Sequence, residues 1–348
     1  EQNTEFVDHF LDVPYNLSQV LFITTANDLY PLPPALEDRL EIIEFPVYIE
    51  EEKRAIAQQY LIPRQLEAHG LQANKIRLED RTLQTIIQEY TYEAGVRGLD
   101  RRIAEILRKI ARRAAEGKKH PQRITPKLLA KLLGPPDYTT MRANDEDSIG
   151  VATGLAWTEA GGDVMTIEVS LLPGKGNLTL TGQLGEIMQE SAQTALSYMR
   201  GRADEFEVPH DDFDNFDLHI HLPEGAVPKD GPSAGVTLAI ALISVFTERK
   251  IRSDVAMTGE VTLRGKILPV GGIREKVMAA RRAGINTVIL PELNQPDLQE
   301  IPAQARKAMN IIAVSNMQEV IDNALLPAPD ERERDMRQQY DEEETESD

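Results

Sequence analysis

The chain has 348 residues, with 57 acidic side chains against 38 basic ones, a net charge of −19 and no cysteine. Disulfide bonds, zinc–thiolate sites and cysteine catalysis are therefore excluded. Non-specific binding of nucleic acid is disfavoured, because the phosphate backbone is bound by clustered lysine and arginine. The longest apolar run, Val236–Phe246, is too short to cross a bilayer.

The N-terminal residues predict the last part of an α/β domain. The first ten, EQNTEFVDHF, have neither an initial methionine nor the basic start of a signal peptide, so we interpret them as an internal point of a longer chain. The apolar run Val20–Thr25 predicts a buried strand. A turn and short helix at 31–40 and a second strand at 41–48 are expected to follow. Residues 1–48 then form one unit.

Residues 49–135 predict a small helical domain. Helical periodicity and end signals occur in four segments, 50–70, 79–95, 99–117 and 125–134. In the last of them Thr125 is expected to cap the helix, with Pro126 at its first position. The third segment carries an apolar stripe and also a run of basic residues, Arg101–His120, that could form a local basic patch. The stripe consists of Leu99, Ile103, Ile106, Leu107 and Ile110.

Strands and helices alternate after a polar segment without periodicity, and this pattern predicts a second α/β domain at 150–327. The polar segment, 136–149, is interpreted as a linker. Strands are expected at 165–172, 217–222, 255–261, 265–270, 286–291 and 310–315, and helices at 184–203, 236–246, 273–284 and 317–326. The acidic residues 328–348 are expected to be a disordered tail.

Ser233 is a candidate nucleophile because it stands in G-P-S-A-G, the spacing of a nucleophile elbow. The helix after it is apolar on nearly every side, so it is expected to be buried with Ser233 at its N-terminus. There, free N–H groups and the helix dipole favour a developing anion. The alternative is that Ser233 is only an N-cap in a tight glycine turn.

All six histidines precede Ser233, so a hydrolase triad in the order Ser–Asp–His cannot be completed. They are His9, His69, His120, His210, His219 and His221. A lysine can replace histidine as the base, provided that burial keeps it neutral near pH 7.

Lys276 is the lysine best placed for that role. It shares a helix face with Ile273, Val277, Ala280 and Gly284, whereas the arginines of this helix, including Arg274, are expected mostly on other faces. Lys250, Lys266 and Lys307 lie in polar segments. The alternative for Lys276 is a lysine at the edge of the core that extends its ammonium group to water.

Other residues are weaker candidates. The Thr258 hydroxyl could orient a neutral lysine, and Asp230 and Glu260 could support the site. His219 and His221 share a strand face, but no third ligand is indicated, so no metal site is expected. The segment Pro173–Gly176 is only faintly similar to a phosphate loop, and the Walker A pattern is absent from the sequence.

Five segments closely resemble the bacterial Lon proteases, and the resemblance extends over nearly the whole chain. They are PKDGPSAG, MTGEVTLRGKILPVGGIREK, GLAWTEAGGD, LTLTGQLGEIMQES and EAGVRGLDRRI. The resemblance implies a multidomain fold: the end of an AAA+ α/β core, its α-helical lid and an α+β Lon-type protease domain. It also implies a serine endopeptidase with a Ser–Lys dyad, in which Ser233 and Lys276 match the catalytic serine and lysine.

The resemblance also implies nucleotide-sensing remnants in the first two domains. Asn27 matches sensor 1, Arg39 the arginine finger and Arg97 sensor 2. It makes the basic run a lid surface rather than a nucleic-acid site. A cytoplasmic hexameric ring that degrades misfolded or unfolded proteins is implied, with ATP and Mg²⁺ in the intact protein and no cofactor for peptide cleavage.

The departures from the family limit these expectations. Walker A and Walker B are missing, so this chain alone is not expected to hydrolyse ATP. Two alternatives stay open beside the peptidase. One is a non-catalytic assembly platform of the Lon type, which need not keep Ser233, Lys276 and Thr258 together. The other is an esterase, which the missing downstream histidine disfavours.

Overall fold

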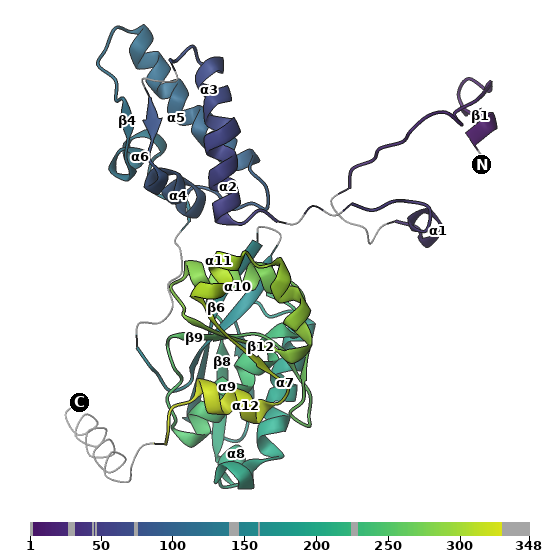
Figure 1. Ribbon diagram of the computed structural model, residues 1–348. Coiled ribbons are helices and arrows are strands. Elements are labelled where there is room, and N and C mark those ends of the chain that lie inside the picture. Colours follow the sequence, from purple (N-terminus) through teal and green to yellow (C-terminus); the bar gives the residue numbers. More distant parts are fainter. Residues whose placement is uncertain are drawn as a thin grey trace. The chain divides into compact units, whose positions relative to one another are not determined.

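The computed structural model describes residues 3–26, 32–43, 45, 47–72, 76–138, 146–158, 161–223 and 229–328. The chain divides into two compact units, residues 1–46 and 47–348, and each is described by itself (Figure 1). The predicted linker is described only in part, and the predicted acidic tail lies outside the described residues except for residue 328.

The first unit contains little regular structure. Its elements are η1 (Asn3–Glu5), the paired strands β1 (Phe6–Val7) and β2 (Pro14–Tyr15), and α1 (Pro34–Glu37), the short helix that the sequence predicts. The buried strand expected at Val20–Thr25 is wrong, because these residues are exposed and form no strand. The described residues of 41–48 form no strand either. A β segment is stabilised by neighbouring strands and a covering layer, and these segments have neither.

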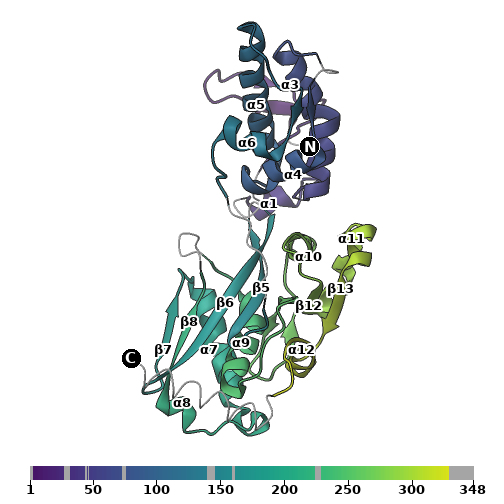
Figure 2. The ribbon, with the colours of Figure 1, turned by 90° about the vertical axis from the view of Figure 1, so that its left-hand side faces the viewer.

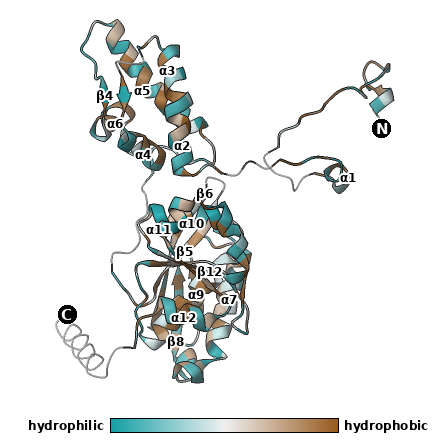
Figure 3. Cartoon of the chain, in the orientation of Figure 1, coloured by the Kyte–Doolittle hydropathy of each residue, from teal (hydrophilic) through white to brown (hydrophobic). Residues whose placement is uncertain are grey.

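The helical part of the second unit confirms the four predicted helical segments. They are α2 (Glu50–Ile56) continuing through the π-helical η2 (Ala57–Leu61) into α3 (Ile62–Ala68), then α4 (Asp80–Glu89), α5 (Arg97–Ala115) and α6 (Pro126–Leu133). Two short strands, β3 (Arg77–Leu78) and β4 (Arg123–Ile124), pair in parallel. Figure 3 shows hydrophilic and hydrophobic residues along each helix, and the predicted stripe of α5 is fully buried in a common core.

Two local details of these helices differ from expectation. Pro63 stands just after the π-helical segment η2. Proline has no N–H group and its ring clashes with the carbonyl four residues earlier, so a wider turn lets the helix continue through it. Thr125 occupies the N-cap position of α6, but its side chain makes no capping hydrogen bond there, contrary to the prediction.

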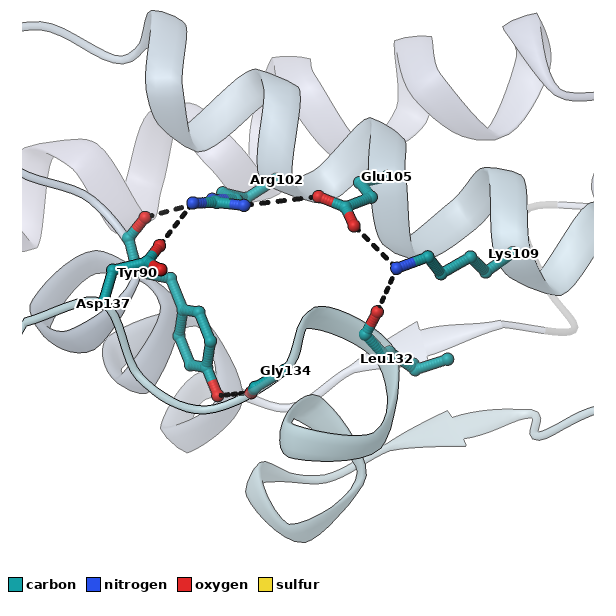
Figure 4. Close-up of polar contacts among 7 residues, drawn as sticks. All are labelled: Tyr90, Arg102, Glu105, Lys109, Leu132, Gly134 and Asp137. Atoms are coloured by element: carbon teal, nitrogen blue, oxygen red, sulfur yellow. Dashed lines mark hydrogen bonds and ion pairs between the residues drawn. The ribbon is translucent and has the colours of Figure 1, made fainter.

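Polar contacts fasten α6 and the residues after it to α5 (Figure 4). Arg102 donates to the carbonyl of Tyr90 at 3.2 Å and also pairs with Glu105 and Asp137. Lys109 donates to Glu105 at 2.6 Å and to the carbonyl of Leu132. The Lys109 hydrogen bond holds the pKa of Glu105 below its ordinary value. Arg102 and Lys109, two residues of the basic run, therefore form their ion pairs and hydrogen bonds within the helical domain.

A seven-stranded mixed sheet organises the rest of the unit, in the order β13-β12-β9-β5-β6-β8-β7 (Figure 2). The strands are β5 (Val151–Thr158), β6 (Gly161–Pro173), β7 (Leu178–Thr181), β8 (Phe216–His221), β9 (Val255–Met257), β12 (Thr287–Pro291) and β13 (Asn310–Val314). β6 is antiparallel to both β5 and β8, and the other pairs are parallel. A separate antiparallel pair joins β10 (Glu260–Val261) and β11 (Ile267–Leu268).

Helices cover both faces of this sheet. Alternate strand residues point to opposite faces, and Met165 and Ile289 belong to one apolar core while Val164 and Val288 belong to the other. The first core includes α7 (Glu186–Arg200), α9 (Gly235–Thr247) and α12 (Met317–Ala324). The second includes α10 (Ile273–Arg282) and α11 (Ala303–Ala308).

The predicted strands and helices of this domain are confirmed, with shifted ends. Strands β5 and β7, the short helix α8 (Asp212–Asn215), the 3₁₀ segments η3 (Ala203–Phe206) and η5 (Glu292–Glu300), and α11 are additional elements. Helix α9 is buried along nearly its whole length, as its apolar sequence predicts. It brings the residues just before it to the inside of the domain.

Candidate active site

Ser233 lies in a 3₁₀ turn, η4 (Pro232–Ala234), that leads directly into α9. The N-cap of α9 is Ala234, so the alternative of Ser233 as a simple N-cap is wrong. Gly231 precedes the turn with φ 127° and ψ 158°, a conformation that is accessible in practice only to glycine. The Ser233 side chain is partly exposed, and the turn that carries it continues directly into a buried helix.

Thr258 and Gly259, which follow β9, hold the backbone of this turn. The carbonyl of Ser233 accepts a hydrogen bond from the Gly259 N–H at 2.9 Å and one from the Thr258 hydroxyl at 3.3 Å. The Gly259 carbonyl in turn accepts from the Val236 N–H at 3.1 Å. The β9–β10 connection thus fixes both the nucleophile turn and the first turn of α9.

Lys276 is buried on α10 and is 2% exposed. Its ammonium Nζ donates to the Thr258 hydroxyl at 3.1 Å. Burial lowers the pKa of Lys276 from 10.5 to about 8. The predicted apolar face is confirmed for Ile273, Val277 and Ala280, which are buried, while Gly284 is exposed. Lysine at this position is an interior residue rather than one that reaches water.

The other residues of α10 correct one expectation. Arg274, expected away from the apolar face that carries Lys276, is also buried and pairs with Glu52 of α2. The contact is between residues 222 positions apart, so helical periodicity could not reveal it. Lys250, Lys266 and Lys307 are exposed, so burial distinguishes Lys276 from them, as predicted.

Ser233 and Lys276 line one open cavity, together with Lys229, Asp230 and the glycine pair Gly271–Gly272. The helices α9 and α10 lie on opposite faces of the sheet, and the loops after β8 and β11 bring their N-terminal ends to this cavity. A partly exposed hydroxyl and a buried amine of lowered pKa share one solvent-accessible space. This arrangement can perform nucleophilic chemistry with general-base assistance.

Asp230 has a definite structural role. Its carboxylate Oδ1 accepts from the N–H of Met188 in the first turn of α7 at 3.0 Å, and from that of Gly231 at 2.9 Å. It therefore ties the nucleophile turn to α7. Glu260, at the start of β10, is partly buried beside Gly259, and its proposed supporting role stays a prediction.

His219 and His221 both contact the hydroxyl of Thr181, at 2.8 and 2.7 Å. This is a polar ladder across β7 and β8. Within the described part of the chain, no cluster of three or more His, Asp or Glu side chains is arranged to hold a metal ion. None of the helices in that part is long and apolar enough to cross a membrane.

The three expected nucleotide-sensing residues lie away from Ser233 in the sequence. Asn27 falls outside the described residues. Arg39 is exposed in the turn after α1, within the first unit. Arg97 is exposed at the first position of α5, where the Glu93 carboxylate accepts from the next two N–H groups, Gly98 and Leu99, at 2.6 and 2.7 Å.

Trp157 is a site residue that reasoning from the sequence missed. It is 58% exposed at the end of β5, lines the cavity and lies directly against Gly272, the N-cap of α10. A Cβ atom on Gly272 would approach the indole Cγ to 2.8 Å, and its φ is 71°. The only sequence signal is the glycine pair Gly271–Gly272 before α10, which indicates that another group packs closely against the backbone. The sequence does not identify that group as Trp157.

Two family models match the chain. A family model described as the Lon protease (S16) C-terminal proteolytic domain matches residues 123–327, more than half of the chain. A model of the Lon protease AAA+ ATPase lid domain matches residues 67–123.

Individual relatives give the same result. The chain is 54% identical over 332 residues to Lon protease 2 of Herpetosiphon aurantiacus, which covers 95% of this chain and 41% of the relative. It is 52% identical over 340 residues to Lon protease of Dictyoglomus thermophilum, covering 96% and 42%. For Lon protease of Syntrophomonas wolfei the identity is 54% over 326 residues, covering 94% and 40%. The chain spans about two fifths of the length of these relatives.

Proposed function

Because the chain belongs to the Lon protease family and carries its lid and its C-terminal proteolytic domain, we propose that Ser233 and Lys276 form the catalytic dyad of a serine endopeptidase. The observation that carries the assignment is the buried Lys276 ammonium. Its Nζ bonds the Thr258 hydroxyl, which in turn bonds the carbonyl of Ser233, both residues line one cavity, and burial brings the pKa of Lys276 to about 8.

The lowered pKa has a direct effect on the supply of base. At pH 7 about one tenth of Lys276 is neutral with a pKa of about 8, against roughly 0.03% with the ordinary value of 10.5. The gain is about 300-fold in the concentration of the reactive form. A solvated lysine at the same place would be a much poorer base at neutral pH.

We propose the following reaction. Neutral Lys276 accepts the proton of the Ser233 hydroxyl while Oγ attacks the carbonyl carbon of the scissile peptide bond. Backbone N–H groups of the turn before α9 stabilise the oxyanion, and protonated Lys276 gives its proton to the leaving amine. Water, deprotonated by the same lysine, then hydrolyses the acyl-enzyme. Thr258 keeps the Lys276 amine oriented throughout.

The test is hydrolysis of an unstructured fluorogenic peptide without nucleotide. Ser233→Ala and Lys276→Met should each lower kcat/KM by about three orders of magnitude or more. Lys307→Met is the matched control, because Lys307 is exposed on α11, and it should retain the wild-type rate. Full activity in Lys276→Met would show that another group is the base. A wild-type chain that binds the peptide without cleaving it would favour the assembly platform.

The wider activity is proposed from the relationship to Lon. Residues 1–48 would be the end of an AAA+ core, and ATP with Mg²⁺ would act in the intact protein, where Asn27, Arg39 and Arg97 would sense the nucleotide. Misfolded or unfolded proteins would be the substrates of a cytoplasmic hexameric ring. Peptide cleavage itself would need no cofactor. Alanine substitution of Arg97 in the full-length protein should lower ATP-stimulated degradation more than hydrolysis of a small peptide.

A further inference from the structure

The helix that carries Lys276 is joined by two ion pairs to α2, which lies in the segment predicted to be the lid and before the residues that the lid model matches. Arg274 Nη2 bonds both carboxylate oxygens of Glu52, at 2.8 and 2.9 Å. Arg281 Nη1 bonds one oxygen of the adjacent Glu51 at 2.7 Å. Both acids are on α2 and both arginines are on α10, so the two pairs offer a comparison within one interface.

The two pairs differ in burial and in distance from Lys276. The Arg274 side chain is 8% exposed and stands two residues before Lys276. The Arg281 side chain is 34% exposed and stands five residues after it. The two acids are similarly exposed, Glu52 at 42% and Glu51 at 40%, so the pairs differ at their arginines. Removing Glu52 leaves a buried guanidinium without its counter-charge, whereas water screens the charge of Arg281.

The Glu52 carboxylate is also held by a second hydrogen bond, from its own helix. Its Oε2 also accepts from the N–H of Ile49, which is the N-cap of α2, at 2.9 Å. Arg274 Nη1 bonds the carbonyl of Val47 at 3.4 Å, just before that helix. Ile49 itself belongs to the same apolar core as Ile273 and Val277. The start of α2 therefore meets the start of α10 through both polar and apolar contacts.

Arg274 is not optimised for stability alone. Its Nε is buried and has no hydrogen-bond partner among the described residues. An unsatisfied buried donor is unfavourable, and an apolar residue would avoid this cost. Nη2 bonds both oxygens of Glu52 and Nη1 bonds the carbonyl of Val47, so the two nitrogens together fix the direction of the guanidinium group and specify the position of the first turn of α10.

We propose that Arg274 is a positioning residue for the peptidase reaction, which the lid helix α2 holds through Glu52 so that α10 presents Lys276 to Ser233. The proposal rests on the proposed Ser–Lys mechanism. It assigns the lid a part in the protease site, in addition to any contact with nucleotide.

The kinetic test compares Glu52→Gln, Arg274→Gln and their double variant with the matched pair Glu51→Gln and Arg281→Gln. Each change in the Arg274–Glu52 pair should lower kcat by roughly 10- to 100-fold with KM little changed, since a small displacement of the base slows the chemical step. The double variant should be no worse than the single ones. Arg274→Lys should recover only part of the rate, because a lysine has one nitrogen and cannot hold Glu52 and the Val47 carbonyl with two separate groups, as Nη2 and Nη1 of Arg274 do. The exposed pair should stay within about twofold of wild type.

A spectroscopic readout shows whether α10 has moved. Trp157 is the single tryptophan of the chain and lies against the N-cap of α10. Its quenching by acrylamide should change in Arg274→Gln and Glu52→Gln but not in Arg281→Gln. Circular dichroism shows whether each variant is folded. If Arg274→Gln does not fold, Arg274→Lys replaces it in both measurements.

Equal rates in the Arg274 and Arg281 variants would overturn the proposal, and so would a fall in kcat with unchanged Trp157 quenching. The proposed function fails by a different result, namely hydrolysis that survives Ser233→Ala. In that case the tryptophan measurement still decides whether Arg274 positions α10.

Discussion

The pH dependence of peptide hydrolysis tests the role of Lys276 most directly. A general base acts only in its neutral form, so kcat/KM should rise with pH and level off above the pKa of Lys276 in the free enzyme. That pKa is about 8, because burial disfavours the ammonium. The neutral fraction is then about 0.1 at pH 7, 0.5 at pH 8 and 0.9 at pH 9. The rate should increase about tenfold between pH 7 and pH 9.

The assay is hydrolysis of a fluorogenic peptide without ionisable side chains, from about pH 6 to about pH 9.5 at constant ionic strength. Ser233→Ala gives the background at each pH, and circular dichroism confirms that the fold is intact over the range. A flat profile between pH 7 and pH 9 would refute the reasoning, because the base would then titrate elsewhere. A profile that still rises steeply at the upper limit would show a solvated lysine with an ordinary pKa.

Two further predictions concern the stability of the site. The folded-state pKa of Lys276 lies below its unfolded value of 10.5, so the unfolded chain binds more protons between about pH 8 and 10.5 and stability rises with pH in that window. Lys276→Met should remove this rise and increase the free energy of unfolding at pH 7 by up to about 3 kcal/mol, measured by urea denaturation; a destabilised variant would contradict it. Gly231→Ala should cost about 1–3 kcal/mol and slow peptide cleavage, because φ 127° is strained for alanine although its Cβ would meet no atom. Gly95→Ala is the control, since its φ lies outside the positive range and its Cβ also has open space, and equal effects in the two variants would refute the strain argument.

Much of the candidate pair, Ser233 and Lys276, could be predicted because its signals are local. The apolar sequence of α9 predicts a buried helix, and Ser233 stands just before it. The spacing of Ile273, Lys276 and Val277 places the lysine on the buried face of α10. Each inference uses only the period of a single helix and the chemistry of its residues.

The failures concern contacts between distant parts of the chain. Arg274 is buried because Glu52 meets it, and no pattern within α10 indicates that partner. Trp157 lies against Gly272 through the packing of β5 beside α10. The strand expected at Val20–Thr25 depends on neighbours that the first unit does not supply. Periodicity reports which face of an element is apolar, but not what will cover it.

Ser233 lies directly before α9, a buried helix, and this position determines how peptide cleavage should be lost on unfolding. Regions with few buried contacts open by local fluctuations, whereas core helices exchange their amide hydrogens only when the whole domain unfolds. Residues Gly235–Ser244 of α9 are all buried between the sheet and α7, so the turn with Ser233 cannot detach from them while the core persists. Heat or denaturant should therefore abolish peptide cleavage in the same transition that melts the protease domain. In this domain the residual activity is a measure of the folded fraction.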